Sequence, residues 1–225
     1  RGGPVAEGNV GGGTGMICNG FKGGTGTASR KLKPAAGGYT LGVLVQCNYG
    51  SPHQLRIAGI PVAREMKLQP FCVSRLMSPP QSLFGMTGKL CDPKALAIAN
   101  PPAEEHRGSI IIVIATDAPL TAEQLKRLAR RAAVGLGRLG AIEGDGSGDI
   151  FIAFSTANAG GDDGNWTKAT DRPAPISRLK SGALNPLFEA TVQGVEEAVV
   201  NAMVAARTMT GADYWTVSAL PHDQL

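Results

Sequence analysis

The most informative run of residues in the chain is Gly108-Ser109-Ile110-Ile111-Ile112-Val113-Ile114-Ala115-Thr116-Asp117. Its five consecutive β-branched residues predict a buried strand, and a serine stands at the head of that strand, directly after a flexible glycine. Cleavage of the Gly108–Ser109 bond would make Ser109 a new N-terminus, with its hydroxyl and its freed amine on one rigid scaffold. The run therefore predicts a strand over 109–116 and raises the hypothesis that Ser109 is a nucleophile.

The composition of the 225 residues is that of a globular protein, with 43% hydrophobic and 18% charged residues. This length suits one large domain or two small ones. The net charge of +4 is mild, and only three Tyr and two Trp are available to stack on bases, so we expect no nucleic-acid partner. We also expect no membrane association, because no apolar run reaches the roughly 18 residues of a membrane span.

The four cysteines are widely spaced, with no C-x-x-C pair, and the three histidines lie far apart. This spacing argues against a zinc site, and we expect neither a metal nor a cofactor. Free thiols in a reducing compartment are the preferred interpretation, and disulfides are the alternative. The expected location is accordingly the cytoplasm, with the periplasm as the second choice.

Glycine is unusually frequent, at 31 residues, and it is concentrated in 2–26 and 135–164. The spacing within 1–30 resembles phosphate-binding loops, but no clear strand precedes it, no helix follows, and the Lys-Ser/Thr pair of a P-loop is missing. We therefore favour a structural role, in which the glycines let loops and strand ends pack against neighbouring backbone.

Two strands are predicted before the proline-rich region. Residues 39–49 have the apolar pattern of a core strand, and 55–62 are expected to return beside it as the second strand of a hairpin. Residues 64–108 contain six prolines and have no periodicity, which predicts a linker leading to Gly108.

Helices and one further strand are predicted after 109–116. Thr121 and Gln124 have the spacing of a capping box, and apolar residues follow at helical spacing as far as Gly140. A strand is expected over 149–156. A long helix is expected from Asn185 as N-cap, with Pro186 at its first position, to about residue 207. Blocks of strands and helices in this order favour sheets covered by helices.

Read together, these segments resemble the self-processing serine aminopeptidases of the DmpA family, which includes L-aminopeptidase/D-esterases and β-peptidyl aminopeptidases. Six motifs in the family's order carry the resemblance, which covers nearly all of the chain outside 64–107. They lie at 5–16, 21–30, 44–50, 108–111, 115–120, and 147–150 running into 153–158.

The resemblance implies an α+β fold, a four-layer αββα sandwich of the N-terminal-nucleophile type. It implies cleavage between Gly108 and Ser109, with Ser109 as the nucleophile. Asn48 would donate to the oxyanion, Ser147 would be a second catalytic serine, and Asp149 would be the acidic partner where many members have Glu. The implied substrates are short peptides, amino-acid amides or esters, and the implied assembly is a homo-oligomer of αβ units.

The implied organisation is a single catalytic domain over 1–225, with an α-chain part over 1–108, whose linker is 64–108, and a β-chain over 109–225. Family members carry a long N-terminal portion before the glycine-rich stretch. The opening Arg1-Gly2-Gly3-Pro4 resembles the middle of a chain, so we expect such a portion upstream.

The chemistry of an N-terminal serine fits this interpretation, because its α-amine, with a pKa of about 7.7–8.0, can serve as the base for its own hydroxyl. Ser147 and Asp149, two residues apart on a strand, would point to the same face and orient that group. Each residue also has a plain structural role as its alternative: Ser109 as a strand-start serine, Ser147 as a turn residue, Asp149 as a solvated strand end and Asn48 as a turn former.

Three additional residues, Glu7, Asn9 and Lys22, either line the pocket or have structural roles. Two further functions remain open for the chain as a whole. One is amino-acid N-acyltransfer on a related scaffold, and the other is a non-catalytic binding module or inactive precursor.

Overall fold

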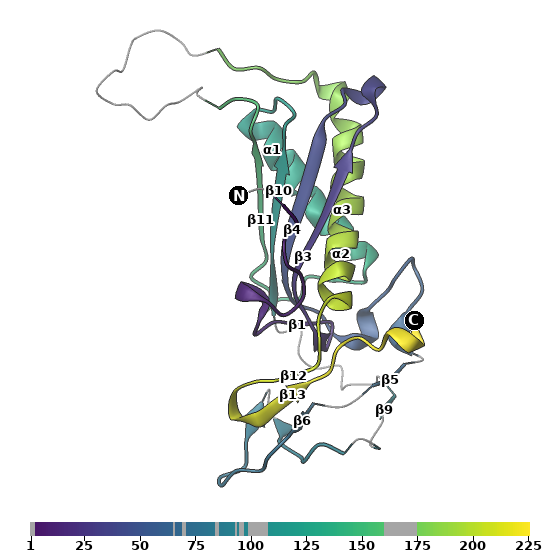
Figure 1. The fold of residues 1–225 in the computed structure, drawn as a ribbon. Helices are drawn as coiled ribbons and strands as arrows, with labels where there is room; N and C mark the ends of the chain where they lie inside the picture. The colour runs from purple at the N-terminus through teal and green to yellow at the C-terminus, as the bar shows by residue number, and fades with distance from the viewer. Residues whose placement is uncertain are drawn as a thin grey trace, which may run out of the picture.

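The computed structural model describes residues 3–64, 66–68, 71–83, 86–92, 94, 97–98, 108–159 and 175–225. Its main sheet has four strands in the order β11-β10-β4-β3, as Figure 1 shows. The pairings β3–β4 and β4–β10 are antiparallel, and β10–β11 is parallel. The bounds of these strands are β3 Gly24–Lys31, β4 Thr40–Asn48, β10 Ser109–Thr116 and β11 Ile150–Ser155.

The centre of this sheet follows from side-chain alternation. In β10 the residues Ile110, Ile112 and Ile114 are fully buried, and the residues between them point to the opposite face. Their partners across the β4 pairing are Cys47, Val45 and Val43, which are buried on the same face. The predicted strands over 39–49, 109–116 and 149–156 are confirmed within one or two residues.

Three helices cover that buried face of the sheet. They are α1 (Ala122–Ala129), α2 (Arg131–Arg138) and α3 (Asn185–Val204). The predicted capping box at Thr121 and Gln124 is present at the start of α1. The structure divides the single helix expected over 121–139 into two at Arg130, and α3 ends at Val204 rather than near residue 207.

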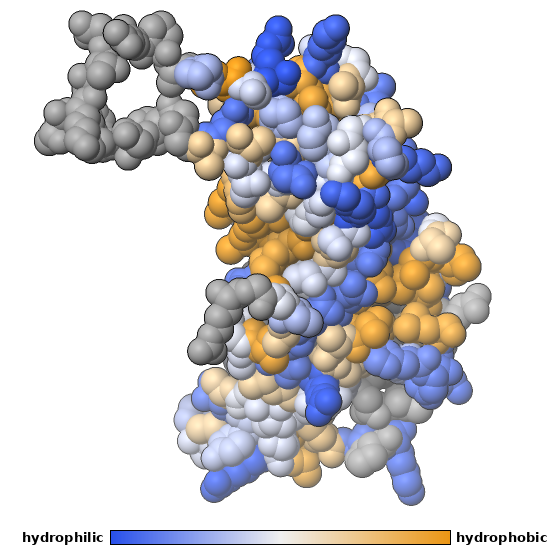
Figure 2. All heavy atoms as spheres, turned by 45° about the horizontal axis from the view of Figure 1, so that its top comes forward, coloured by the Kyte–Doolittle hydropathy of each residue, from blue (hydrophilic) through white to orange (hydrophobic). Residues whose placement is uncertain are grey.

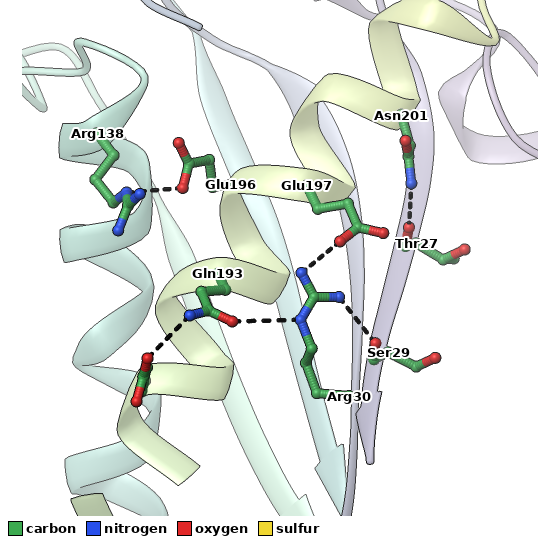
Figure 3. A network of polar contacts seen from close by, with 9 residues as sticks. Thr27, Ser29, Arg30, Arg138, Gln193, Glu196, Glu197 and Asn201 are labelled. Carbon is green, nitrogen blue, oxygen red and sulfur yellow. Dashed lines mark hydrogen bonds and ion pairs between the residues drawn. The ribbon is translucent and has the colours of Figure 1, made fainter. Parts of the chain in front are cut away.

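Close packing of α3 on the sheet depends on small residues. A Cβ on Gly26 of β3 would lie 1.9 Å from the Ala198 carbonyl oxygen, so only glycine allows the helix to approach this closely. Figure 3 shows the polar contacts at the edge of this packing: Asn201 Nδ2 donates to the Thr27 carbonyl oxygen at 2.8 Å, and Arg30 pairs with Glu197. The glycines of 1–30 thus serve close packing, as predicted, although β3 was missed as a strand.

The opposite face of the sheet is left open over β10 and β11 by the described residues. Ile150, Ile152 and Phe154 of β11 are 46–50% exposed there, beside Ile111 of β10. Figure 2 shows apolar side chains gathered on the side of the molecule where β11 lies. The described residues therefore form one sheet layer and one helix layer, which are two of the four layers expected.

A small second sheet, β12-β13-β6, lies beyond one end of the main sheet, on the side of the short strand β1 (Ile17–Cys18), as Figure 1 shows. It pairs β6 (Cys72–Val73), from the region predicted as a linker, with β13 (Trp215–Val217) and β12 (Met209–Thr210) near the C-terminus. The remaining two-residue strands are β1 Ile17–Cys18, β2 Phe21–Lys22, β5 Lys67–Leu68, β7 Ser82–Leu83, β8 Met86–Thr87 and β9 Ala97–Ile98.

Two predictions about the first half of the chain were wrong. Residues 55–62 do not return beside β4, because β3 and β10 already occupy both of its edges; they contain only an Ile57–Ile60 bridge. The 64–108 segment is a structured part of the fold where it is described, since β6 pairs with β13 and Cys72 is bonded to Cys91. Residues 99–107, directly before Gly108, lie outside the described residues.

The preference for free thiols was also wrong, since all four cysteines form disulfides, Cys18–Cys47 and Cys72–Cys91. The sequence separations of 29 and 19 residues were too long for a local spacing motif to reveal the pairs. The first disulfide joins β1 to the end of β4, next to Asn48.

We expect each disulfide to stabilise the fold by about 3–4 kcal/mol, because it restricts the unfolded chain. Replacing Cys18 and Cys47 together with serine should lower the free energy of unfolding by about that amount, measured by urea denaturation. Thiol titration of the denatured protein should find no reactive thiol before reduction and four after it. Four free thiols in the unreduced protein would contradict both disulfides.

Candidate active site

The structure places Ser109 and Asn48 side by side. Ser109 is the first residue of β10, and its partner across the antiparallel pair is Asn48, the last residue of β4. Since Ile110 and Cys47 point into the core, the side chains of Ser109 and Asn48 project from the open face of the sheet. These two predicted site residues, from different halves of the chain, therefore meet at the end of the sheet.

The residue before the nucleophile candidate has room only for glycine. Gly108 has φ +129°, a backbone conformation that L side chains rarely adopt. A Cβ on Gly108 would lie 2.2 Å from the Asn48 carbonyl oxygen. The Gly108–Ser109 peptide group is thus held directly against the end of β4.

The loop before β11 holds the start of β10 through two hydrogen bonds. The Gly148 N–H donates to Ser109 Oγ at 2.8 Å, and the Ile110 N–H donates to Asp149 Oδ1 at 2.9 Å. Ser147 lies in the same loop, where its N–H donates to the Gly144 carbonyl oxygen at 2.8 Å. Ser147 and Asp149 therefore precede the strand rather than lie on it, so the predicted strand geometry of this pair was wrong although both residues are at the site.

The orientation of the Asn48 amide is set by a backbone donor. Ile17 N–H donates to Asn48 Oδ1 at 2.9 Å, which fixes the oxygen of the amide on the side of β1. The Nδ2 group then lies on the other side of the amide, where no acceptor for its two hydrogens is found among the described residues. This orientation fits the predicted role of Asn48 as a donor to an oxyanion.

A small pocket lies beside Gly108, and neither Ser109 nor Asn48 is among the residues that line it. Besides Gly108, Ser147 and Asp149, it is lined by Tyr49, Gly50, Gln54, Ala141, Ile142, Glu143 and Gly144. Burial, and secondarily the charge of Asp149, raise the pKa of the Glu143 carboxyl. Burial also raises the pKa of the Tyr49 hydroxyl, whose polar neighbour is Asn19. With two carboxyl groups in its wall, the pocket favours a positively charged group such as an amine.

Tyr49 and Glu143 line the pocket but were not predicted as site residues from the sequence. Tyr49 could have been predicted as a site residue, because it directly follows Asn48. Glu143 lies in a turn in which its own backbone has φ +47°, and a sequence motif does not reveal such a conformation.

The three additional residues named from the sequence are not among those that line this pocket. Glu7 Oε1 accepts hydrogen bonds from the Thr27 N–H and hydroxyl at 2.7 and 2.6 Å. Asn9 Oδ1 accepts from the Arg207 N–H at 3.0 Å. Glu7 and Asn9 therefore hold the N-terminal segment on the fold, and Lys22 is buried beside β1. Within the described ranges, no cluster of three or more His, Cys, Asp or Glu could hold a metal ion, and no helix is long and apolar enough to cross a membrane.

Known proteins resemble this chain over nearly all of its length. The family model described as "Peptidase family S58" matches residues 1–217. The beta-peptidyl aminopeptidase BapA of Sphingosinicella microcystinivorans is 46% identical over 223 residues, which are 99% of this chain and 51% of that protein. The BapA of Sphingosinicella xenopeptidilytica is 44% identical, over 100% of this chain and 50% of its own length. The chain thus spans about half the length of the curated relatives it matches.

Solved structures give the same result for the fold. A Burkholderia sp. beta-aminopeptidase matches with a TM-score of 0.78 and 39% identity, over 100% of this chain and 53% of that one. The L-aminopeptidase D-Ala-esterase/amidase of Ochrobactrum anthropi, described as a prototype of the serine aminopeptidases and a variant of the Ntn hydrolase fold, matches with a TM-score of 0.74 and 42% identity, over 99% of this chain and 52% of that one. The predicted N-terminal-nucleophile-type fold is confirmed.

Proposed function

The chain belongs to peptidase family S58, and on that premise we propose that it carries the nucleophile of a self-processing serine aminopeptidase. The observation that supports this most strongly is the pairing of Ser109 with Asn48, with Gly108 held against the Asn48 carbonyl. The proposed substrates are short peptides, amino-acid amides or esters with a free amine. The names of the relatives, beta-peptidyl aminopeptidases and an L-aminopeptidase D-Ala-esterase/amidase, support this class.

The first proposed step is cleavage of the chain by itself. Ser109 Oγ attacks the carbonyl carbon of Gly108, and the Asn48 Nδ2 group donates to the oxyanion that forms. The Oγ proton passes to the Ser109 nitrogen as the C–N bond breaks, which leaves an ester between the Gly108 carbonyl carbon and Ser109 Oγ and a free amine on Ser109. Water hydrolyses the ester, which separates 1–108 from 109–225. The tethered geometry favours the attack, because both reacting groups are already in one place.

Turnover repeats the same chemistry on a substrate. The freed α-amine of Ser109 accepts the proton from its own hydroxyl, Oγ attacks the substrate carbonyl, and the leaving amine takes the proton. Water then releases the acyl group. The loop donor Gly148 N–H stabilises the developing charge on Oγ, and the carboxyl groups of Asp149 and Glu143 attract amines to the pocket.

The assembly and the compartment follow as proposals from two structural features. One face of the sheet carries the exposed side chains of Ile150, Ile152 and Phe154. Their exposure supports burial of that face in the assembled enzyme, which we propose is an oligomer of αβ units. The two disulfides support folding in an oxidising compartment such as the periplasm rather than the cytoplasm. Four free thiols in protein alkylated at the moment of lysis would instead support the cytoplasm.

The function is tested by mass spectrometry and hydrolysis on the same preparation. We expect two masses that correspond to cleavage between Gly108 and Ser109, and release of the N-terminal residue from an aminoacyl or β-aminoacyl p-nitroanilide. An intact chain without turnover would overturn the proposal. Product that forms only with an added amine acceptor would favour acyl transfer instead.

A further inference from the structure

A buried lysine is connected to Asn48 through a single peptide group. The Met16 carbonyl oxygen accepts hydrogen bonds from Lys22 Nζ and from the Gly23 N–H. On the other side of the same peptide group, the Ile17 N–H donates to Asn48 Oδ1 at 2.9 Å. Lys22 is therefore linked by consecutive hydrogen bonds to the amide that faces Ser109.

The burial of Lys22 makes a charge on its ammonium group energetically unfavourable. Its side chain is only 3% exposed, and within the described parts of the chain no carboxylate pairs with it. Burial lowers the pKa of its ammonium group to about 8. Since a buried charge without a counter-ion destabilises a fold, an apolar residue would suit this position better on grounds of stability alone.

We propose that Lys22 is a positioning residue of the oxyanion site, which acts through the Met16–Ile17 peptide group to fix and polarise the Asn48 amide. The inference rests on the proposed function of Asn48. A cation at the Met16 carbonyl draws electrons toward that oxygen, and this makes the Ile17 N–H a stronger donor. The stronger donor holds Asn48 Oδ1 more firmly and leaves Nδ2 a better donor to the oxyanion.

The proposal predicts a particular pH dependence. Lys22 acts in its charged form, so kcat should fall as the pH rises through about 8. The Ser109 amine acts in its neutral form, so it gives a rise in the opposite direction, near its ordinary pKa of about 7.7–8.0. Among the described residues, Lys22 hydrogen-bonds or pairs with groups at Met16, Ile17 and Ser218, which carry no charge, and the neighbouring Cys18 is in a disulfide.

Kinetics on the intact protein test the positioning role. Lys22→Met should lower kcat by roughly 10- to 100-fold with little change in KM, because the oxyanion contact is made in the transition state. In an Asn48→Ala background the same change should add almost nothing, since Lys22 acts through Asn48. Lys22→Arg keeps the charge and should remove the fall in kcat above pH 8. Lys31→Met, which removes an exposed lysine of β3, is the control and should leave kcat unchanged.

A readout independent of activity separates this inference from the proposed function. In Ser109→Ala, which frees no amine at that position, the Asn48 side-chain amide resonance should titrate with a midpoint near 8 in ¹⁵N NMR. It should not titrate after the further change Lys22→Met. A flat resonance in the first protein, or the same titration in both, would overturn the inference even if the enzyme is active. Equal, additive losses for Lys22→Met with and without Asn48 would also overturn it.

Discussion

Replacing Ser109 with alanine is expected to leave the chain uncut at Gly108 and to lower kcat/KM for an aminoacyl p-nitroanilide by a factor of at least about 10⁴. The change removes the atom that forms the acyl bond in both self-cleavage and turnover. The fold should persist, because Ser109 is half-buried at the start of its strand and, among the described residues, its hydroxyl accepts only the Gly148 N–H. Mass spectrometry and initial-rate kinetics measure the two losses.

The matched control is Ser29→Ala, which removes an exposed serine from β3 of the same sheet. This variant should be cut and active like the unchanged protein. If Ser109→Ala is still cut between Gly108 and Ser109, or keeps the original rate, another group is the nucleophile and the assignment of Ser109 is wrong.

Replacing Gly108 with alanine is expected to slow self-cleavage by about 100-fold or more, although every proposed catalytic side chain remains. The added Cβ would lie 2.2 Å from the Asn48 carbonyl oxygen, at φ +129°, so the peptide group must move away from β4. The displacement separates the Gly108 carbonyl carbon from Ser109 Oγ and from the Asn48 amide. A time course of the intact and cut masses after synthesis measures the rate.

Gly137→Ala is the control for this prediction, because a Cβ at that position of α2 meets nothing within 4 Å. It should be cut at the original rate. Normal cutting of Gly108→Ala would mean that the end of β4 yields easily, and that the tight contact with Asn48 does not define the geometry of cleavage.

The parts of the fold that were predictable from the sequence have strong local patterns. The β-branched run of β10, the alternation in β4 and the capping box of α1 each determine an element without help from distant residues. The strand β3 was missed because the two glycines of its Gly-Thr-Gly-Thr start have low strand propensity. Packing against α3 requires glycine at position 26. The Cys18–Cys47 and Cys72–Cys91 pairs likewise depend on contacts between distant segments.

The features of the candidate site were likewise only partly predictable from the sequence. Ser109, Asn48, Ser147 and Asp149 were identified by family resemblance, and the structure adds that the first two are direct partners across β4 and β10. The orientation of the Asn48 amide could not be predicted, because it depends on a hydrogen bond from Ile17, 31 residues away. Lys22 was named, but its link to Asn48 exists only once β1 and β2 have paired.

The open face of the sheet bears directly on the strength of the chemistry. Ser109 and Asn48 project from the same face as exposed Ile150 and Ile152, so solvent reaches the region around the reacting atoms when that face is bare. Water weakens electrostatic contacts by its high dielectric constant, and excluding it strengthens each donor to an oxyanion. Covering this face with the remaining layers of the expected four-layer fold would therefore strengthen the electrostatic contribution of groups that are already in place.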